Sequence, residues 1–151
     1  MSVAFRREGD DEHKEPRFEL PIPPGPNWVT PRGWELLVAK VAEFEAMPRK
    51  ADTLTEPDPV QRQLRYWRTR LSTAQLAPTP SDGEAGIGSR VSFTLAGAQR
   101  TITIVGDDEA EPVTGLLSFL APLSRSLLGS AAGDVIDFGG RVGAIKVIAV
   151  D

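Results

Sequence analysis

The sequence predicts an α+β protein, in which an antiparallel α-helical hairpin precedes an antiparallel β domain with one short helix. Three observations support this prediction. Apolar residues recur at heptad spacing over 34–44 and again over 60–74, which is typical of a short coiled coil. From residue 91 onward, apolar and polar residues alternate, which is typical of half-buried strands. Residues 77–88, rich in proline, glycine, serine and aspartate, separate the two patterns.

The first helix is expected to begin at Thr30, whose hydroxyl can accept a hydrogen bond from a free amide of the first turn. Pro31 suits the first helical position, and Pro48 should end the helix. The same signal recurs at Asp58-Pro59 and predicts the start of the second helix. Helices this short are marginal in water, so each needs the apolar seam of the other. The expected seam residues are Trp34, Leu37, Val41 and Phe44 in the first helix and Val60, Leu64, Trp67, Leu71 and Ala74 in the second.

The β domain should contain five strands, joined in part by the turns at 96–98 and 139–140. The expected strands are 91–95, 101–104, 116–120, 135–138 and 142–150, and the short helix is 122–128. The whole chain then divides into a charged and proline-rich tail at 1–29, a hairpin at 30–76, a linker at 77–88 and a β domain at 89–151. For the tail we expect disorder or an extended strap on the folded part.

The composition narrows the classes of function. A formal charge of −4 and a pI near 5.1 argue against attraction of the whole chain to nucleic acid and leave room for a local basic face. The absence of cysteine excludes disulfides and thiolate metal sites and suits a reducing cytoplasm. No segment approaches the roughly 18 uninterrupted apolar residues of a membrane span, and the amino terminus lacks the apolar core of a secretory signal. We therefore expect a cytoplasmic protein without a membrane partner.

Three motifs follow one another along the chain. Residues 27–34 read Asn-Trp-Val-Thr-Pro-Arg-Gly-Trp, and residues 104–112 read Ile-Val-Gly-Asp-Asp-Glu-Ala-Glu-Pro. Residues 118–129 contain a serine, Pro122 and Leu-Leu-Gly, and Gly-Asp follows at 133–134. In this order and behind a helical hairpin, the motifs resemble those of the GreA/GreB transcript cleavage factors. The resemblance covers most of the chain after the tail.

The resemblance implies an FKBP-like fold for the β domain and RNA polymerase as the partner. In Gre factors the β domain docks at the rim of the polymerase secondary channel, and the coiled coil enters the channel. Acidic residues at its tip help to hold a second Mg²⁺ and an attacking water, so that the polymerase cleaves its own backtracked RNA. Such a factor binds no cofactor alone, shares Mg²⁺ with the polymerase and is not an enzyme by itself. Nascent RNA within the complex is a further candidate partner.

The expected hairpin tip offers Asp52, Glu56 and Asp58 as candidate metal ligands, since Asp-x-Leu-Thr-Glu at 52–56 is similar to the Asp-Leu-Ser-Glu of the family. The alternative is that Asp58 caps the second helix and the other two are solvated turn residues. Each arm is about ten residues shorter than the usual Gre arm, which at about 1.5 Å per residue retracts the tip by about 15 Å. Two mechanisms stay open: stimulated cleavage through Asp52 and Glu56, or occupation of the channel without cleavage, as in the regulator of nucleoside diphosphate kinase.

Two further sets of residues are candidate contacts. Arg62, Arg65 and Arg68 lie on a predicted helix without acidic residues. They form either a basic stripe that faces RNA or the acidic wall of a channel, or an ordinary solvated helix face. The resemblance implies polymerase docking at Ser118 and Pro122, with Leu120 between them. Leu120 stands where the family has a polar residue, and strand core is its alternative role.

Two other functions are weaker candidates. FKBP-like domains can be prolyl isomerases, but such a site needs an apolar pocket lined by several aromatic residues, and the β region offers only Phe93, Phe119 and Phe138. An adaptor for another protein partner is the third possibility. The sequence contains no Ser/His/Asp or Cys/His set that could form a nucleophilic triad.

Overall fold

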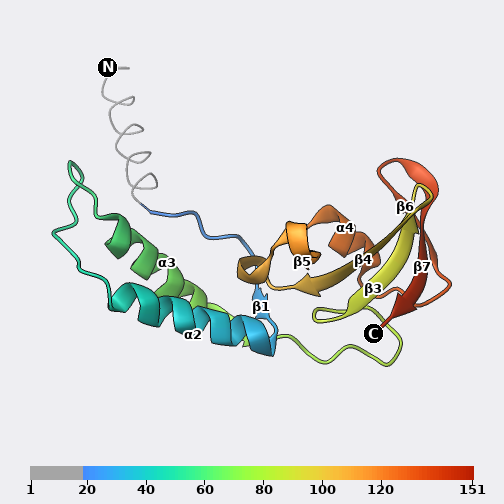
Figure 1. Cartoon of the computed structure of the whole chain (residues 1–151), viewed down its shortest axis with the longest axis horizontal. Helices are drawn as coiled ribbons and strands as arrows, with labels where there is room; N and C mark the ends of the chain where they lie inside the picture. Colours follow the sequence, from blue (N-terminus) through green and yellow to red (C-terminus); the bar gives the residue numbers. More distant parts are fainter. Residues whose placement is uncertain (1–18) are drawn as a thin grey trace, which may run out of the picture. The chain divides into compact units, whose positions relative to one another are not determined.

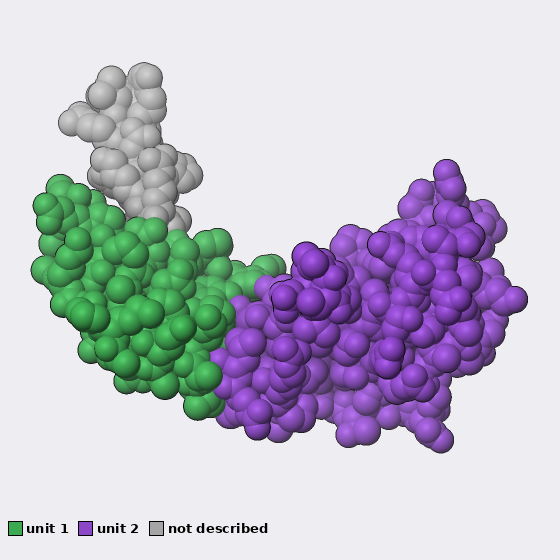
Figure 2. Space-filling view, in the orientation of Figure 1, with its two compact units in different colours: residues 1–26, 37–73 green, residues 27–36, 74–151 purple. Residues whose placement is uncertain are grey.

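The computed structural model describes residues 19–151, so the first 18 residues of the expected tail lie outside the described part of the chain. The chain forms two compact units, which Figure 2 draws in different colours. The hairpin unit contains residues 37–73 together with 19–26 of the described chain. The β unit contains residues 27–36 and 74–151.

Two helices, α2 (Pro31–Glu45) and α3 (Pro59–Thr73), run side by side and are joined by residues 46–58 (Figure 1). The Oγ1 atom of Thr30 accepts a hydrogen bond from the amide of Gly33 at 3.1 Å. The Oδ1 atom of Asp58 accepts one from the amide of Val60 at 3.1 Å. Both predicted helix starts are therefore confirmed. No helix of the described chain is long and apolar enough to cross a bilayer.

The predicted seam is confirmed at its centre and differs at one end. Leu37 is fully buried and Leu64 nearly so, while the seam residues that follow them are half-buried. Lys40 Nζ lies 5.7 Å from the ring centroid of Trp67 on the other helix. Trp34 is 38% exposed rather than packed in the seam. Trp34 belongs to the β unit rather than to the hairpin unit. Ala74, the last predicted seam residue, also differs, because α3 ends at Thr73 and Ala74 lies in a strand.

A short parallel strand pair lies where the sequence indicated a tail and the end of a helix. β1 (Asn27–Val29) pairs with β2 (Ala74–Leu76), with Asn27 opposite Ala74 and Val29 opposite Leu76. The amide of Ala77 continues the ladder by donating to the carbonyl of Val29 at 2.9 Å. The chain therefore enters and leaves the helical hairpin through one hydrogen-bonded ladder of the β unit. This pairing joins segments far apart in sequence, which local patterns do not reveal.

The β unit contains a five-stranded sheet in the order β5-β4-β3-β7-β6. Its strands are β3 (Arg90–Leu95), β4 (Ala98–Val105), β5 (Leu116–Ser118), β6 (Val135–Phe138) and β7 (Arg141–Val150), and α4 (Pro122–Leu127) is the short helix. The predicted α+β class is thus confirmed. The sheet is mixed rather than wholly antiparallel, because β5 pairs with β4 in parallel. Two-residue turns with positive φ angles, at Ala96-Gly97 and Gly139-Gly140, close the two hairpins where the sequence predicted them.

The core of the β unit lies between one face of the sheet and α4. Val91 and Phe93 of β3 face it together with Ile145 of β7, and all three are fully buried. Leu127 brings α4 onto the same cluster. Burial of each such side chain contributes about 1.5–3 kcal/mol. The alternating burial along β3 confirms the period of two that predicted it.

Candidate functional site

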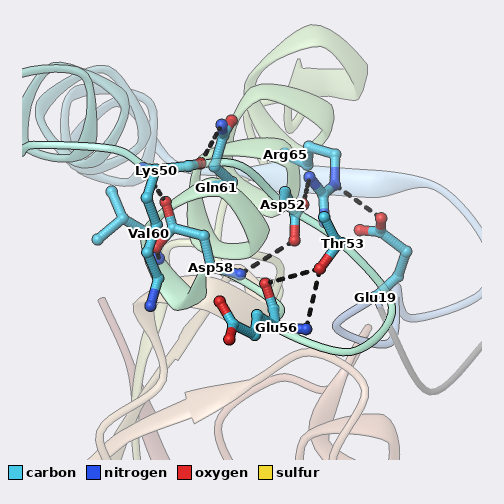
Figure 3. Close-up of polar contacts among 9 residues, drawn as sticks. All are labelled: Glu19, Lys50, Asp52, Thr53, Glu56, Asp58, Val60, Gln61 and Arg65. Carbon is cyan, nitrogen blue, oxygen red and sulfur yellow. Dashed lines mark hydrogen bonds and ion pairs between the residues drawn. The ribbon is translucent and has the colours of Figure 1, made fainter.

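Asp58, the residue before α3, holds together the segment that joins the two helices. It is 3% exposed. Besides capping Val60, its carboxylate accepts a hydrogen bond from the amide of Lys50 at 2.9 Å through Oδ2. The amide of Asp58 in turn donates to Oδ1 of Asp52 at 3.0 Å (Figure 3). One carboxylate therefore caps α3 and ties the beginning of the tip segment to it, as the cap alternative predicts.

The second oxygen of Asp52 accepts a hydrogen bond from Nη1 of Arg65 on α3. Desolvation raises the pKa of Asp52, but the hydrogen bond from Asp58 and the charge of Arg65 outweigh it and lower that pKa overall. A carboxyl whose pKa is lower in the folded chain stabilises the fold above its unfolded pKa, and this contribution is lost as the pH falls through the folded value. At neutral pH Asp52 is ionised and neutralised by Arg65.

Glu56 is the third acidic residue of the tip, and it is exposed. Its backbone amide donates to Oγ1 of Thr53 at 2.9 Å, but its carboxylate has no hydrogen bond or ion pair within residues 19–151. Those residues contain no group of three or more His, Cys, Asp or Glu side chains placed to hold a metal ion. The donor set therefore does not fit a metal site of the tip's own. Asp52 and Asp58 bind groups of the hairpin unit, which leaves Glu56 as the uncommitted carboxylate.

The arginines predicted to form a basic stripe on α3 have acidic neighbours. Arg65 contacts Glu19 at 2.7 Å, in addition to Asp52. Arg68 lies 3.5 Å from Glu45 of α2. The Nε atom of Arg62 is buried and makes no hydrogen bond within the described chain. Arg65 and Arg68 are thus paired with carboxylates from outside α3. Because these pairs offset part of its positive charge, the arginine face of α3 is less basic than its sequence indicates.

The three candidate docking residues lie together in the segment that leads from β5 into α4. Ser118 donates from its hydroxyl to Oδ1 of Asp107 at 2.8 Å and accepts from the amide of Leu120 at 3.1 Å. Leu120 is half-buried and packs against the core, as its strand-core alternative predicts. Pro122 is exposed and begins α4. The structure therefore presents Pro122 at the start of α4, directly after a turn that the hydrogen bonds of Ser118 help to hold.

Glu109 is a buried carboxylate that was not among the predicted site residues. It ends the 3-10 turn η1 (Asp107–Glu109) and is 5% exposed. Its carboxylate accepts hydrogen bonds from the hydroxyl of Thr30 at 2.6 Å, the amide of Thr30 at 3.2 Å and the amide of Gly106 at 3.1 Å. The start of α2 is thereby fastened to the segment that follows β4.

Two glycines make this contact possible. A Cβ atom on Gly33 would overlap the carboxylate of Glu109, and one on Gly106 would lie 2.7 Å from the backbone oxygen of Trp28. Both are closer than side chains approach. Thr30 and Gly33 belong to the first motif, and Gly106 and Glu109 to the second. The two motifs therefore contact each other in the fold. The sequence alone does not show this contact, because Thr30 and Glu109 are 79 residues apart.

Comparison with known proteins gives a family match for the C-terminal half of the chain. The family model described as "Transcription elongation factor, GreA/GreB, C-term" matches residues 80–151, which hold the five-stranded sheet, Glu109 and the segment from Ser118 to Pro122. Residues 80–151 match the GreA/GreB C-terminal domain. The resemblance predicted from the motifs is confirmed here.

Several GreA proteins are similar to the chain over this region. Transcription elongation factor GreA of Thermomicrobium roseum is 34% identical over 80 residues, which are 51% of this chain and 51% of that protein. GreA of Lactococcus lactis subsp. cremoris strain SK11 is 35% identical over 96 residues, 61% of this chain and 58% of that protein. The chain spans about half the length of the first curated relatives that it matches.

Solved structures of the same family are also similar to the chain. GreA factor homolog 1 (Gfh1) of Thermus thermophilus has a TM-score of 0.39 and 20% identity, covering 84% of this chain and 99% of that one. The GreA/GreB factor of Nitrosomonas europaea has a TM-score of 0.40 and 20% identity, covering 84% of this chain and 98% of that one.

Proposed function

We propose that the chain is a Gre-family transcription elongation regulator that binds RNA polymerase at the secondary channel. The match of residues 80–151 to the GreA/GreB C-terminal domain carries this proposal. In Gre factors this domain docks on the polymerase, and here the exposed Pro122 at the start of α4 offers a docking surface of the same kind. The protein acts on the polymerase, in the cytoplasm, rather than as an enzyme of its own.

The hairpin tip supports a regulator that occupies the channel without stimulating cleavage. Mg²⁺ needs carboxylate oxygens that are free to coordinate it in near-ideal geometry. Asp58 uses both oxygens to cap α3 and to hold Lys50, and Asp52 is paired with a cation. Glu56 alone has an uncommitted carboxylate among the described residues of the tip. A prolyl isomerase has no comparable support, because Phe93 and Phe119 lie in the buried core instead of lining an open pocket.

Binding to the polymerase is tested first with core enzyme. Purified core RNA polymerase should retain the full chain, and an excess of a GreA factor should displace it. Replacing the exposed Pro122 with aspartate should weaken retention by about tenfold or more, because an unpaired charge would be buried in the interface. Val113→Asp is the matched control, since Val113 is 96% exposed elsewhere on the β unit. Equal retention of both variants, or none by the native chain, would contradict docking through this surface.

Cleavage is tested on stalled elongation complexes. The chain should not increase release of the 3′ RNA fragment above the intrinsic rate of the polymerase, whereas a GreA factor added in parallel should. Glu56→Ala should leave this result unchanged, because a single carboxylate does not complete the metal site. Stimulated cleavage that Glu56→Ala abolishes would overturn the proposal and restore the cleavage mechanism.

A further inference from the structure

Glu19, near the beginning of the described chain, contacts the arginine face of α3. Its Oε1 atom lies 2.7 Å from Nε of Arg65, whose Nη1 atom binds Asp52 at the same time (Figure 3). The hydrogen bond that Arg65 donates to Glu19 is the largest contribution that raises the pKa of Arg65. One guanidinium is therefore shared between the tip of the hairpin and the segment that precedes the helix pair, and all of these residues belong to the hairpin unit.

This contact is held weakly. The side chains of Arg65 and Glu19 are 37% and 47% exposed, and ion pairs with that much exposure contribute little to stability. A groove of about 380 Å³ lies between the segment and the helix, lined by Glu19, Leu20, Ile22, Arg65, Tyr66 and Thr69. Ile22 of the segment is 44% exposed, so its side chain is not buried against the helix. A stronger anion could take the place of Glu19.

The charges on both sides of the contact indicate which ligand would compete. Arg62, Arg65 and Arg68 of α3 are partly or fully exposed, whereas Arg70 is buried, and α3 has no acidic residue of its own to offset their charge. The segment from Glu8 to Glu19 contains six acidic and two basic residues. Glu19, the last acidic residue of this sequence, contacts Arg65 of α3. A chain of phosphates offers repeated negative charge of the same kind, and arginine binds phosphate in a bidentate manner.

We infer that residues 19–22 form a strap that competes with the phosphate backbone of single-stranded RNA for Arg65. With the strap in place, Arg65 is neutralised from both sides, and the α3 face binds RNA poorly. When RNA displaces Glu19, the guanidinium faces a phosphate instead. The strap is therefore an intramolecular inhibitor of RNA binding. This inference goes beyond the proposed function and does not require polymerase as the partner.

The test compares Glu19→Gln with the native full chain in binding to a fluorescent oligouridine, measured by anisotropy at several salt concentrations without polymerase. Glu19→Gln should bind about two- to fivefold more tightly at low salt, the range expected for loss of a surface ion pair. The slope of log K against log salt should steepen by up to about 0.7, as for one additional phosphate contact on a single strand. Glu35→Gln is the matched control: it changes the net charge equally, and exposed Glu35 pairs with no arginine of the described chain.

A second variant assigns the gain to Arg65. Glu19→Gln combined with Arg65→Gln should lose the gain, whereas Arg65→Gln alone should change RNA binding little, with circular dichroism verifying the helices. Equal affinities and slopes for the native chain and Glu19→Gln would overturn the inference, as would an equal gain in Glu35→Gln or a gain that persists without Arg65. A gain for polyglutamate but not for oligouridine would also overturn it and indicate an acidic protein partner.

Discussion

Replacing Glu109 with alanine should destabilise the β unit by about 3 kcal/mol, the energy expected when buried donors lose their acceptor. The amides of Thr30 and Gly106 would be left unsatisfied, at about 1–3 kcal/mol each. The hydroxyl of Thr30 would suffer less, because it still accepts from the amide of Gly33. The loss of stability should be large because Gly33 and Gly106 pack closely around Glu109, with no room for a Cβ atom.

The measurement is thermal unfolding of the full chain, in which about 3 kcal/mol should lower the transition of the β unit by about 10 °C or more. Glu109→Gln should fall between alanine and the native residue, because its amide keeps one acceptor oxygen of similar position. Glu111→Ala removes an exposed glutamate two residues away and should change stability by less than about 0.5 kcal/mol. Equal losses for Glu109→Ala and Glu111→Ala would mean that the buried carboxylate does not fasten the start of α2.

The elements that the sequence predicted well are those that depend on neighbouring residues. Thr30 and Asp58 are each followed by a proline, and both cap helices as expected. The alternation in 91–95 and the glycines at 139–140 specify strands and a turn within a few residues. The parallel pairings of β1 with β2 and of β4 with β5 depend on contacts between distant segments. Ala74 shows the same limit, because heptad spacing does not tell that the helix ends at Thr73.

The candidate site follows the same division. Asp52, Glu56 and Asp58 were identified as tip residues from their position between two helices. Whether the carboxylate of Asp52 is free depends on Arg65, which is thirteen residues away in the sequence. Arg65 is shared with Glu19, which precedes the first helix. The sequence of α3 shows its arginines, but it does not show that Glu19, Glu45 and Asp52 from other segments pair with them. Ionic pairings of this kind become visible only with the fold.

Replacing Asp58 with alanine should destabilise the helical hairpin by about 2–3 kcal/mol. Loss of an N-terminal cap accounts for about 1–2 kcal/mol of this, and the unsatisfied amide of Lys50 for the rest. The hydrogen bond from Gln61 Nε2 to the carbonyl of Lys50, at 3.1 Å, would still tie the tip to α3, so the segment should loosen rather than detach. Because α3 has only 15 residues, loss of its cap should also lower its helicity.

The decisive comparison is between Asp58→Ala, Asp58→Ser and Glu56→Ala, measured by helicity on heating and by proteolysis between residues 46 and 58. Serine can still cap Val60 and should recover about half of the loss, whereas Glu56→Ala should be neutral because its carboxylate has no partner in the described chain. A metal ligand would behave differently: its removal would leave the melting curve unchanged and reduce only cleavage on the polymerase. Stable helices in Asp58→Ala would therefore reject the cap as the main role of this residue. If Asp58→Ala lowers the melting temperature and Asp58→Ser partly restores it, the carboxylate of Asp58 stabilises the fold of the tip. A carboxylate used in this way is not free to bind a metal ion, and we therefore expect no stimulation of cleavage by this tip.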